Sequence, residues 1–149
     1  MKTTALIALL LWIPAVGAQA PDGEEPAPNV RFTYVNVYVD SEARLLAAYQ
    51  FELAAKRGDA RIAGVEGGDH EAFRKPPYYD PEALRTGRII LAAFSTADAL
   101  PKGRTRVARL MMRVAGDQEP TYDVHLRVAA SPNGTRIPAT ISIQQGEAK

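Results

Sequence analysis

The sequence predicts an all-β protein, an antiparallel β-sandwich of about eight short strands. Two observations predict it. Segments in which apolar and polar residues alternate recur along the chain, as in strands with one buried face. Turns rich in Gly and Pro separate these segments at roughly regular spacing, without the long helical patterns that parallel βαβ units need. One domain over residues 30–145 is expected, since about 120 residues can form a single core.

The first two predicted strands cover residues 32–40 and 46–53. In the first, valines recur with period two. In the second, Phe51 and its alternate neighbours share one face, while Gln50 and Glu52 point the other way. The second segment also contains good helix formers, so a helix is the alternative there. The alternation favours a strand.

Five further strands are predicted, at residues 60–65, 88–94, 105–114, 122–129 and 137–143. Along 122–129, Val124, Leu126 and Val128 are expected to face the core, and His125 and Arg127 the solvent.

Turn residues punctuate these strands. Ser131-Pro132-Asn133-Gly134 is a strong hairpin signal between the last two. Before the strand at 88–94, Asp80 is predicted to cap one helical turn that begins at Pro81.

The N-terminal residues predict an exported protein, periplasmic or secreted. Residues 1–18 resemble a signal peptide, with a positive charge, an apolar run at 5–13 and small residues before the cut. Cleavage fits after Ala18 or after Ala20, and the first is preferred because Pro21 would follow the second. Residues 19–29 are acidic and Pro-rich, which predicts a flexible leader, and 146–149 form a polar tail.

Composition limits the partners. No cysteine is present, so disulfides and thiolate metal sites are excluded. The chain has 18 basic and 17 acidic residues, and removal of Lys2 with the signal peptide leaves 17 of each. Nucleic-acid binders show a basic surplus, so no such partner is expected. After the signal peptide, no segment is long and apolar enough to predict a membrane span.

Catalytic signatures are sparse. The sequence has no Gly-x-Ser-x-Gly elbow and two histidines, His70 and His125. His70 lies between Asp69 and Glu71, but three consecutive side chains diverge and rarely converge on one ion. His125 is expected on a polar strand face. The sequence therefore predicts a protein that is not an enzyme, with no catalytic residue, metal site or cofactor. A small periplasmic hydrolase is the rival class, and requires two carboxylates or a His–acid pair meeting in a cleft.

Tyr78 and Tyr79 are the candidate carbohydrate-binding residues. They lie in an irregular segment bounded by prolines, and tyrosine rings can stack on sugar rings. The only tryptophan, Trp12, falls in the predicted signal peptide. Alternatively, one tyrosine closes the end of the sandwich while the other is partly exposed.

The succession of strands and glycine turns resembles cohesin-like domains, a carbohydrate-binding-module type of sandwich. The resemblance spans residues 30–145, and four segments carry it, LLAAYQFEL at 45–53, ARIAGVEGG at 60–68, TGRIILAAF at 86–94 and LPKGRTRVARLMMRV at 100–114. The chain departs from the family where the first strand pair is compressed into 32–40 and where Ala54-Ala55 replaces Tyr-Asp.

The resemblance implies a jelly-roll of nine strands, so an antiparallel jelly-roll of eight or nine strands is the expected fold. Known members bind dockerin modules in cellulose-degrading assemblies at the cell surface. By this resemblance the chain is a non-catalytic module that binds a dockerin-like or other envelope protein, and the alternative is a module that binds a polysaccharide. The family's binding sheet, transferred to this chain, comprises Gln50, Glu52, Arg88, Ile90, His125 and Arg127.

Overall fold

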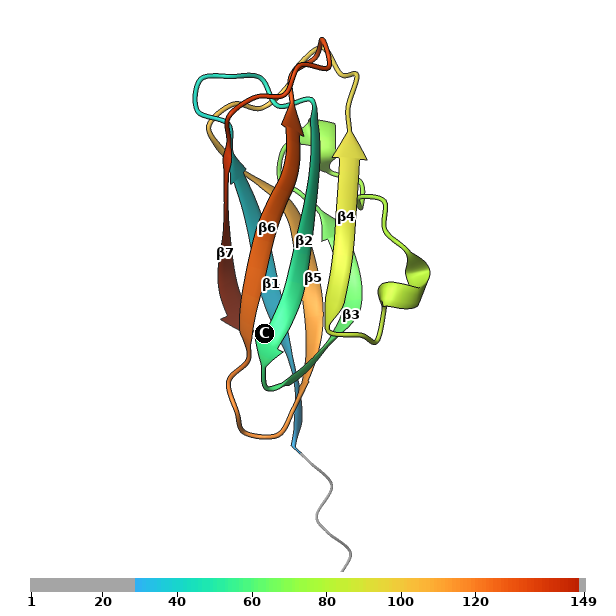
Figure 1. Ribbon diagram of the computed structural model, residues 1–149. Coiled ribbons are helices and arrows are strands. Elements are labelled where there is room, and N and C mark those ends of the chain that lie inside the picture. Colours follow the sequence, from blue (N-terminus) through green and yellow to red (C-terminus); the bar gives the residue numbers. More distant parts are fainter. Residues whose placement is uncertain (1–28, 148–149) are drawn as a thin grey trace, which may run out of the picture.

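The computed structural model describes residues 29–147 and shows a β-sandwich of two antiparallel sheets (Figure 1). The seven strands of this part of the chain are β1 (Val30–Asp40), β2 (Ala48–Arg57), β3 (Asp59–Gly67), β4 (Arg88–Phe94), β5 (Arg104–Ala115), β6 (Thr121–Ala130) and β7 (Thr140–Glu147). One sheet has the order β3-β5-β1-β7 and the other the order β4-β2-β6. The predicted all-β sandwich is confirmed, with seven strands in place of eight or nine.

Every strand lies in the opposite sheet from the strand before it, so each β-pair joins segments distant in sequence. The predicted hairpin forms locally, with an antiparallel bridge between Ala130 and Arg136 and the Ile137 N–H donating to the Ala129 carbonyl at 2.9 Å, but it does not make β6 and β7 neighbours in a sheet. The tight turn forms, with the Gly134 N–H donating to the Ser131 carbonyl at 2.9 Å. However, Ile137 is buried, and the chain crosses the sandwich there, so β7 pairs with β1 rather than with β6.

The core lies between the two sheets and follows the predicted alternation. Residues 46–53 form a strand rather than a helix, because Tyr49, Phe51 and Leu53 must all face the four-stranded sheet. The Tyr49 hydroxyl donates to the Val107 carbonyl at 2.9 Å and so links the two sheets. Burial raises the pKa of the Tyr49 phenol, which remains protonated and available as a donor.

Bulges in the described strands change which side chains face the core, and two of them bear on the predicted faces. In β5 the register against β1 shifts between Val37 and Tyr38, so Val107 is buried beside Ala108. In β6 the shift sets Val128 opposite Gln50, on the outer face. The prediction that Val128 faces the core is therefore wrong, because one extra residue reverses the alternation beyond it.

Two short 3₁₀ helices precede β4, η1 (Glu71–Phe73) and η2 (Pro81–Ala83), and η2 projects beside β4 in Figure 1. The predicted cap is confirmed, since the Glu82 N–H donates to Asp80 Oδ1 at 3.0 Å. Tyr78 forms an isolated β-bridge with Ala92, which widens the three-stranded sheet by one residue.

The predicted signal peptide and all of the leader except Asn29 lie outside the described residues. The final strand runs to Glu147, two residues past the predicted domain end, so the predicted tail begins inside β7. Between residues 29 and 147 no helix has the length and hydrophobicity to cross a bilayer.

Candidate functional site

The outer face of the β4-β2-β6 sheet brings together all six residues predicted to bind a partner. Glu52 on the central strand stands opposite Ile90 on β4 and His125 on β6. Gln50 stands opposite Val128 in the neighbouring row. Residues that are directly opposite in a sheet have Cβ atoms about 5 Å apart, so these side chains form one continuous surface.

A carboxylate with two arginines lies at the centre of this face. Arg88 Nε donates to Glu52 Oε1 at 2.7 Å, and Arg127 Nη2 donates to the other carboxylate oxygen. The hydrogen bond from Arg88 is the largest cause, ahead of that from Arg127, that lowers the pKa of Glu52 from 4.5 to about 2. The carboxylate is therefore ionised across the physiological range.

The two arginines cover the carboxylate between them. The Glu52 side chain is 11% exposed, whereas those of Arg88 and Arg127 are 64% and 49% exposed. A partner docked on this face would thus meet the guanidinium groups first. Glu52 acts as the anchor that holds them in position, a role that its outward register alone did not indicate.

The bulge in β6 adds one side chain to this outer face. It places Arg127 and Val128 consecutively on the outer side of the sheet, where regular alternation would send one of them to the core. Arg127 reaches across to Glu52 on the central strand, and Val128 adds an apolar group next to Gln50.

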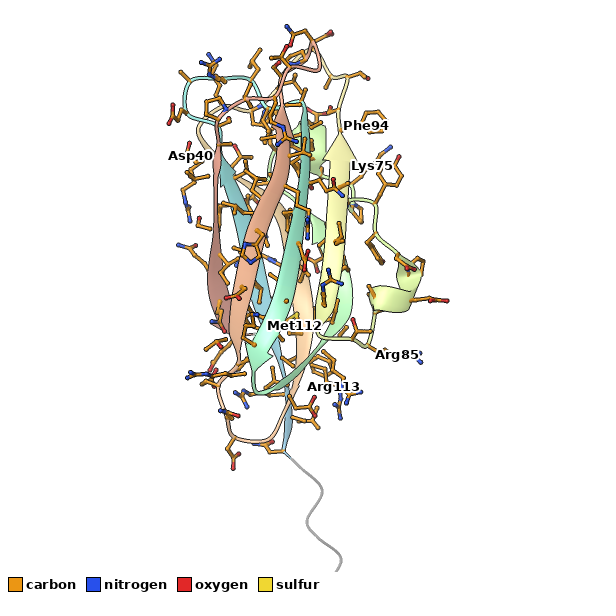
Figure 2. All side chains as sticks on the ribbon, in the orientation of Figure 1. Asp40, Lys75, Arg85, Phe94, Met112 and Arg113 are labelled. Atoms are coloured by element: carbon orange, nitrogen blue, oxygen red, sulfur yellow. The ribbon has the colours of Figure 1, made fainter. Side chains whose placement is uncertain are left out.

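An exposed pair of aromatic rings lies at the β4 edge of the same face. Tyr78 is 72% and Phe94 is 67% exposed, and their ring centroids are 6.3 Å apart with an interplanar angle of 14°. Figure 2 shows Phe94 at the end of β4, directed away from the sandwich. The backbone of Tyr78 is held by two hydrogen bonds with Ala92, of 2.8 and 3.0 Å. Both rings are therefore presented on a fixed backbone.

The two candidate tyrosines have different environments. Tyr79 is half-buried and packs against the core, so the ring that lies beside Tyr78 is Phe94. Shallow hollows of about 450 and 520 Å³ flank Tyr78 on its two sides. The first is bordered by Arg88 and Ile90, and therefore continues the central face to the sheet edge.

The histidines are used structurally or lie in solvent. His70 Nδ1 accepts a hydrogen bond from the Ala72 N–H at 3.2 Å and caps η1, while Asp69 pairs with Arg106. Asp69 and His70 are therefore directed to different partners. Across residues 29–147, no three His, Cys, Asp or Glu side chains gather as a metal site would require. His125 is exposed on the outer face.

No known protein family, curated protein or solved structure matches this chain. Its function is therefore inferred from the chemistry of the β4-β2-β6 face.

Two members of this face were not predicted from the sequence. Phe94 continues the outward alternation of Arg88 and Ile90, so a signal for it was present in the sequence. Val128 had no such signal, because its position depends on the bulge.

Proposed function

We propose that this chain is an exported, non-catalytic module of cohesin type that binds a partner protein through the β4-β2-β6 face. One observation carries the proposal. Exposed apolar side chains lie beside two arginines that a shared carboxylate holds in place. Ile90 is 38% exposed, and with Tyr78 and Phe94 it makes up half of the six exposed large hydrophobic side chains of the described residues.

This composition is typical of protein interfaces. Their centres are enriched in aromatic residues and arginine, and a few such residues supply most of the binding free energy. Side chains that are already ordered lose less conformational entropy on binding. Arg88 and Arg127 are ordered by Glu52, so the face is preorganised for a partner.

The arginines also indicate the chemistry of the partner. Arg88 uses Nε and Arg127 uses Nη2 to bind Glu52, which leaves other guanidinium N–H groups of both residues for a second acceptor. Carboxylate groups accept such bonds best. The proposed partner therefore carries acidic side chains around an apolar patch that covers Ile90 and Phe94.

The test uses the chain from residue 19 to 149, which includes the whole described fold. It is immobilised against envelope and culture-medium proteins of its source, and each captured protein is purified for titration. Arg127→Glu and Ile90→Asp should each weaken binding at least tenfold, because they remove a central contact. Arg44→Glu, an exposed loop residue away from this face, serves as the charge control.

If all three variants bind the captured protein as tightly as the unsubstituted chain does, the proposed binding surface is wrong. The thermal midpoint of each variant is measured alongside, so that lost binding is not confused with lost folding. Export is tested separately. If the signal peptide is cleaved after Ala18, mass spectrometry of the secreted or periplasmic protein should find Gln19 as its first residue.

The stacked rings of Tyr78 and Phe94 favour a second candidate, a polysaccharide-binding module. Two exposed rings at 14° to each other offer a flat apolar surface for sugar rings. Retention on an insoluble polysaccharide that is abolished by Tyr78→Ala and by Phe94→Ala, but not by Arg127→Glu, would support this candidate. Tyr79→Ala tests the other candidate tyrosine, whose ring is half-buried against the core and borders the same hollow as Tyr78.

A further inference from the structure

A further hollow lies on the other sheet, where β1, β3 and β5 meet the segment after η2. Its volume is about 380 Å³, within the range of small-ligand sites. Its apolar lining includes Phe32, Ala63 and Leu84, and three arginines border it, Arg61, Arg85 and Arg113. We call this site the basic hollow. It shares no residue with the β4-β2-β6 face.

Two of the three arginines, Arg85 and Arg113, have no acidic partner among the described residues. Arg61 and Arg113 stand directly opposite each other in the β3–β5 register, an unfavourable pairing for like charges. Asp59 contacts Arg61 at 3.3 Å, and no other salt bridge of the described residues involves any of the three. The basic hollow thus has an excess of positive charge.

Two other arginines on the same face of β5 do have hydrogen-bond and ion-pair partners within the protein. Arg106 Nη1 and Arg109 Nε donate to Asn36 Oδ1 at 3.1 and 2.9 Å. Arg106 also pairs with Asp69, and Arg109 lies 3.8 Å from a carboxylate oxygen of Glu66. The sheet therefore supplies acceptors for these two arginines but none for Arg113, whose guanidinium N–H groups stay available for a ligand.

Arg85 is held in place by an unusual backbone. Its φ of 71° lies in the left-handed region, which residues other than Gly rarely adopt. The Arg85 N–H donates to the Ile62 carbonyl and the Ile62 N–H donates to the Thr86 carbonyl, both at 2.8 Å. These bonds tie Arg85 to the outer edge of β3. Figure 2 shows Arg85 and Arg113 at the same end of the sandwich, although they come from distant segments.

The apolar side of the basic hollow is partly exposed to solvent. Phe32 is 46% exposed and stands opposite Arg113 in the β1–β5 register. Exposed phenylalanine beside unpaired guanidinium groups suits a molecule with one anionic end and one apolar end, since the first binds Arg in a bidentate manner and the second covers the ring.

We propose that the basic hollow binds a small amphiphilic carboxylate, with its carboxylate on Arg85 and Arg113 and its apolar part against Phe32, Ala63 and Leu84. The site is distinct from the proposed partner face, so the two can be occupied independently.

Calorimetric titration of the chain 19–149 tests this with three probes. Octanoate carries both features, acetate only the charge and 1-octanol only the chain. Octanoate should bind at least tenfold more tightly than either of the others. Arg85→Gln and Arg113→Gln should each weaken octanoate at least tenfold, because each removes a charged hydrogen bond. Arg44→Gln should leave its affinity unchanged.

Amide chemical-shift mapping on the unsubstituted chain gives a readout that does not depend on the folding of any variant. Octanoate should shift residues 61–63, 84–86 and 113. Shifts confined to Tyr78 and Phe94, undiminished binding by both arginine variants, or no saturation at millimolar octanoate would each overturn the proposal.

Discussion

Glu52 should control both the acid stability of the sandwich and the order of its binding face. The folded protein holds the pKa of Glu52 at about 2, against a usual value of 4.5, chiefly through the hydrogen bond from Arg88. Between these two values the unfolded chain takes up a proton that the folded chain does not. Stability contributed by Glu52 is therefore fully present above about pH 5 and is lost as the pH falls towards 2.

The prediction is tested on the neutral variant Glu52→Gln. At pH 7 this variant should unfold at a lower temperature than the unsubstituted protein, because both arginines lose their shared carboxylate. The difference in thermal midpoint should shrink as the pH falls from 5 to 2, where the original side chain also becomes neutral.

Direct titration of the Glu52 side-chain carboxyl carbon by NMR gives the midpoint itself. A midpoint near 2 agrees with the structure, and Arg88→Gln or Arg127→Gln should raise it. Arg61→Gln, which belongs to a separate ion pair, is the control and should leave the midpoint in place. A midpoint near 4.5 in the unsubstituted protein would refute the reasoning, since it would mean that neither arginine holds the carboxylate.

Three further predictions concern the scaffold, and each is read from the free energy of unfolding in urea. Leu110→Ala should lower it by about 2–5 kcal/mol, because the side chain is fully buried and its removal leaves a cavity. Gly68→Ala should destabilise by at least about 1–3 kcal/mol, since the new Cβ would meet the Arg106 carbonyl oxygen and lie 2.9 Å from the Val107 Cα. Gly64→Ala is its control, as its nearest contact is an ordinary 3.5 Å. Asp80→Ala should cost about 1 kcal/mol through the lost cap of η2, and an unchanged value would contradict the observed hydrogen bond.

In both candidate sites, local sequence patterns identify some of the residues. The same patterns do not predict how those residues are arranged in space. Alternation along β2 was sufficient to predict that Gln50 and Glu52 point outward, whereas the resemblance to a known family grouped them with Arg88 and Ile90. The same alternation failed at Val128, because a bulge inserts one residue without any mark in the local sequence. Tyr78 and Tyr79 were both named as candidates from the sequence, with the alternative that only one of them is exposed, and the exposed ring beside Tyr78 is Phe94 of β4.

The sequence by itself determined the fold class and most strand positions of this protein, because periodicity and turn chemistry are local properties. The tertiary structure alone decided which strands pair. Every strand crosses to the opposite sheet, so β7 lies beside β1 and residues far apart in the chain meet. The pairing of Glu52 with Arg88 and Arg127, and the gathering of Arg61, Arg85 and Arg113, depend on that crossing. Long-range contacts of this kind follow from burial of the whole core, which no short segment encodes.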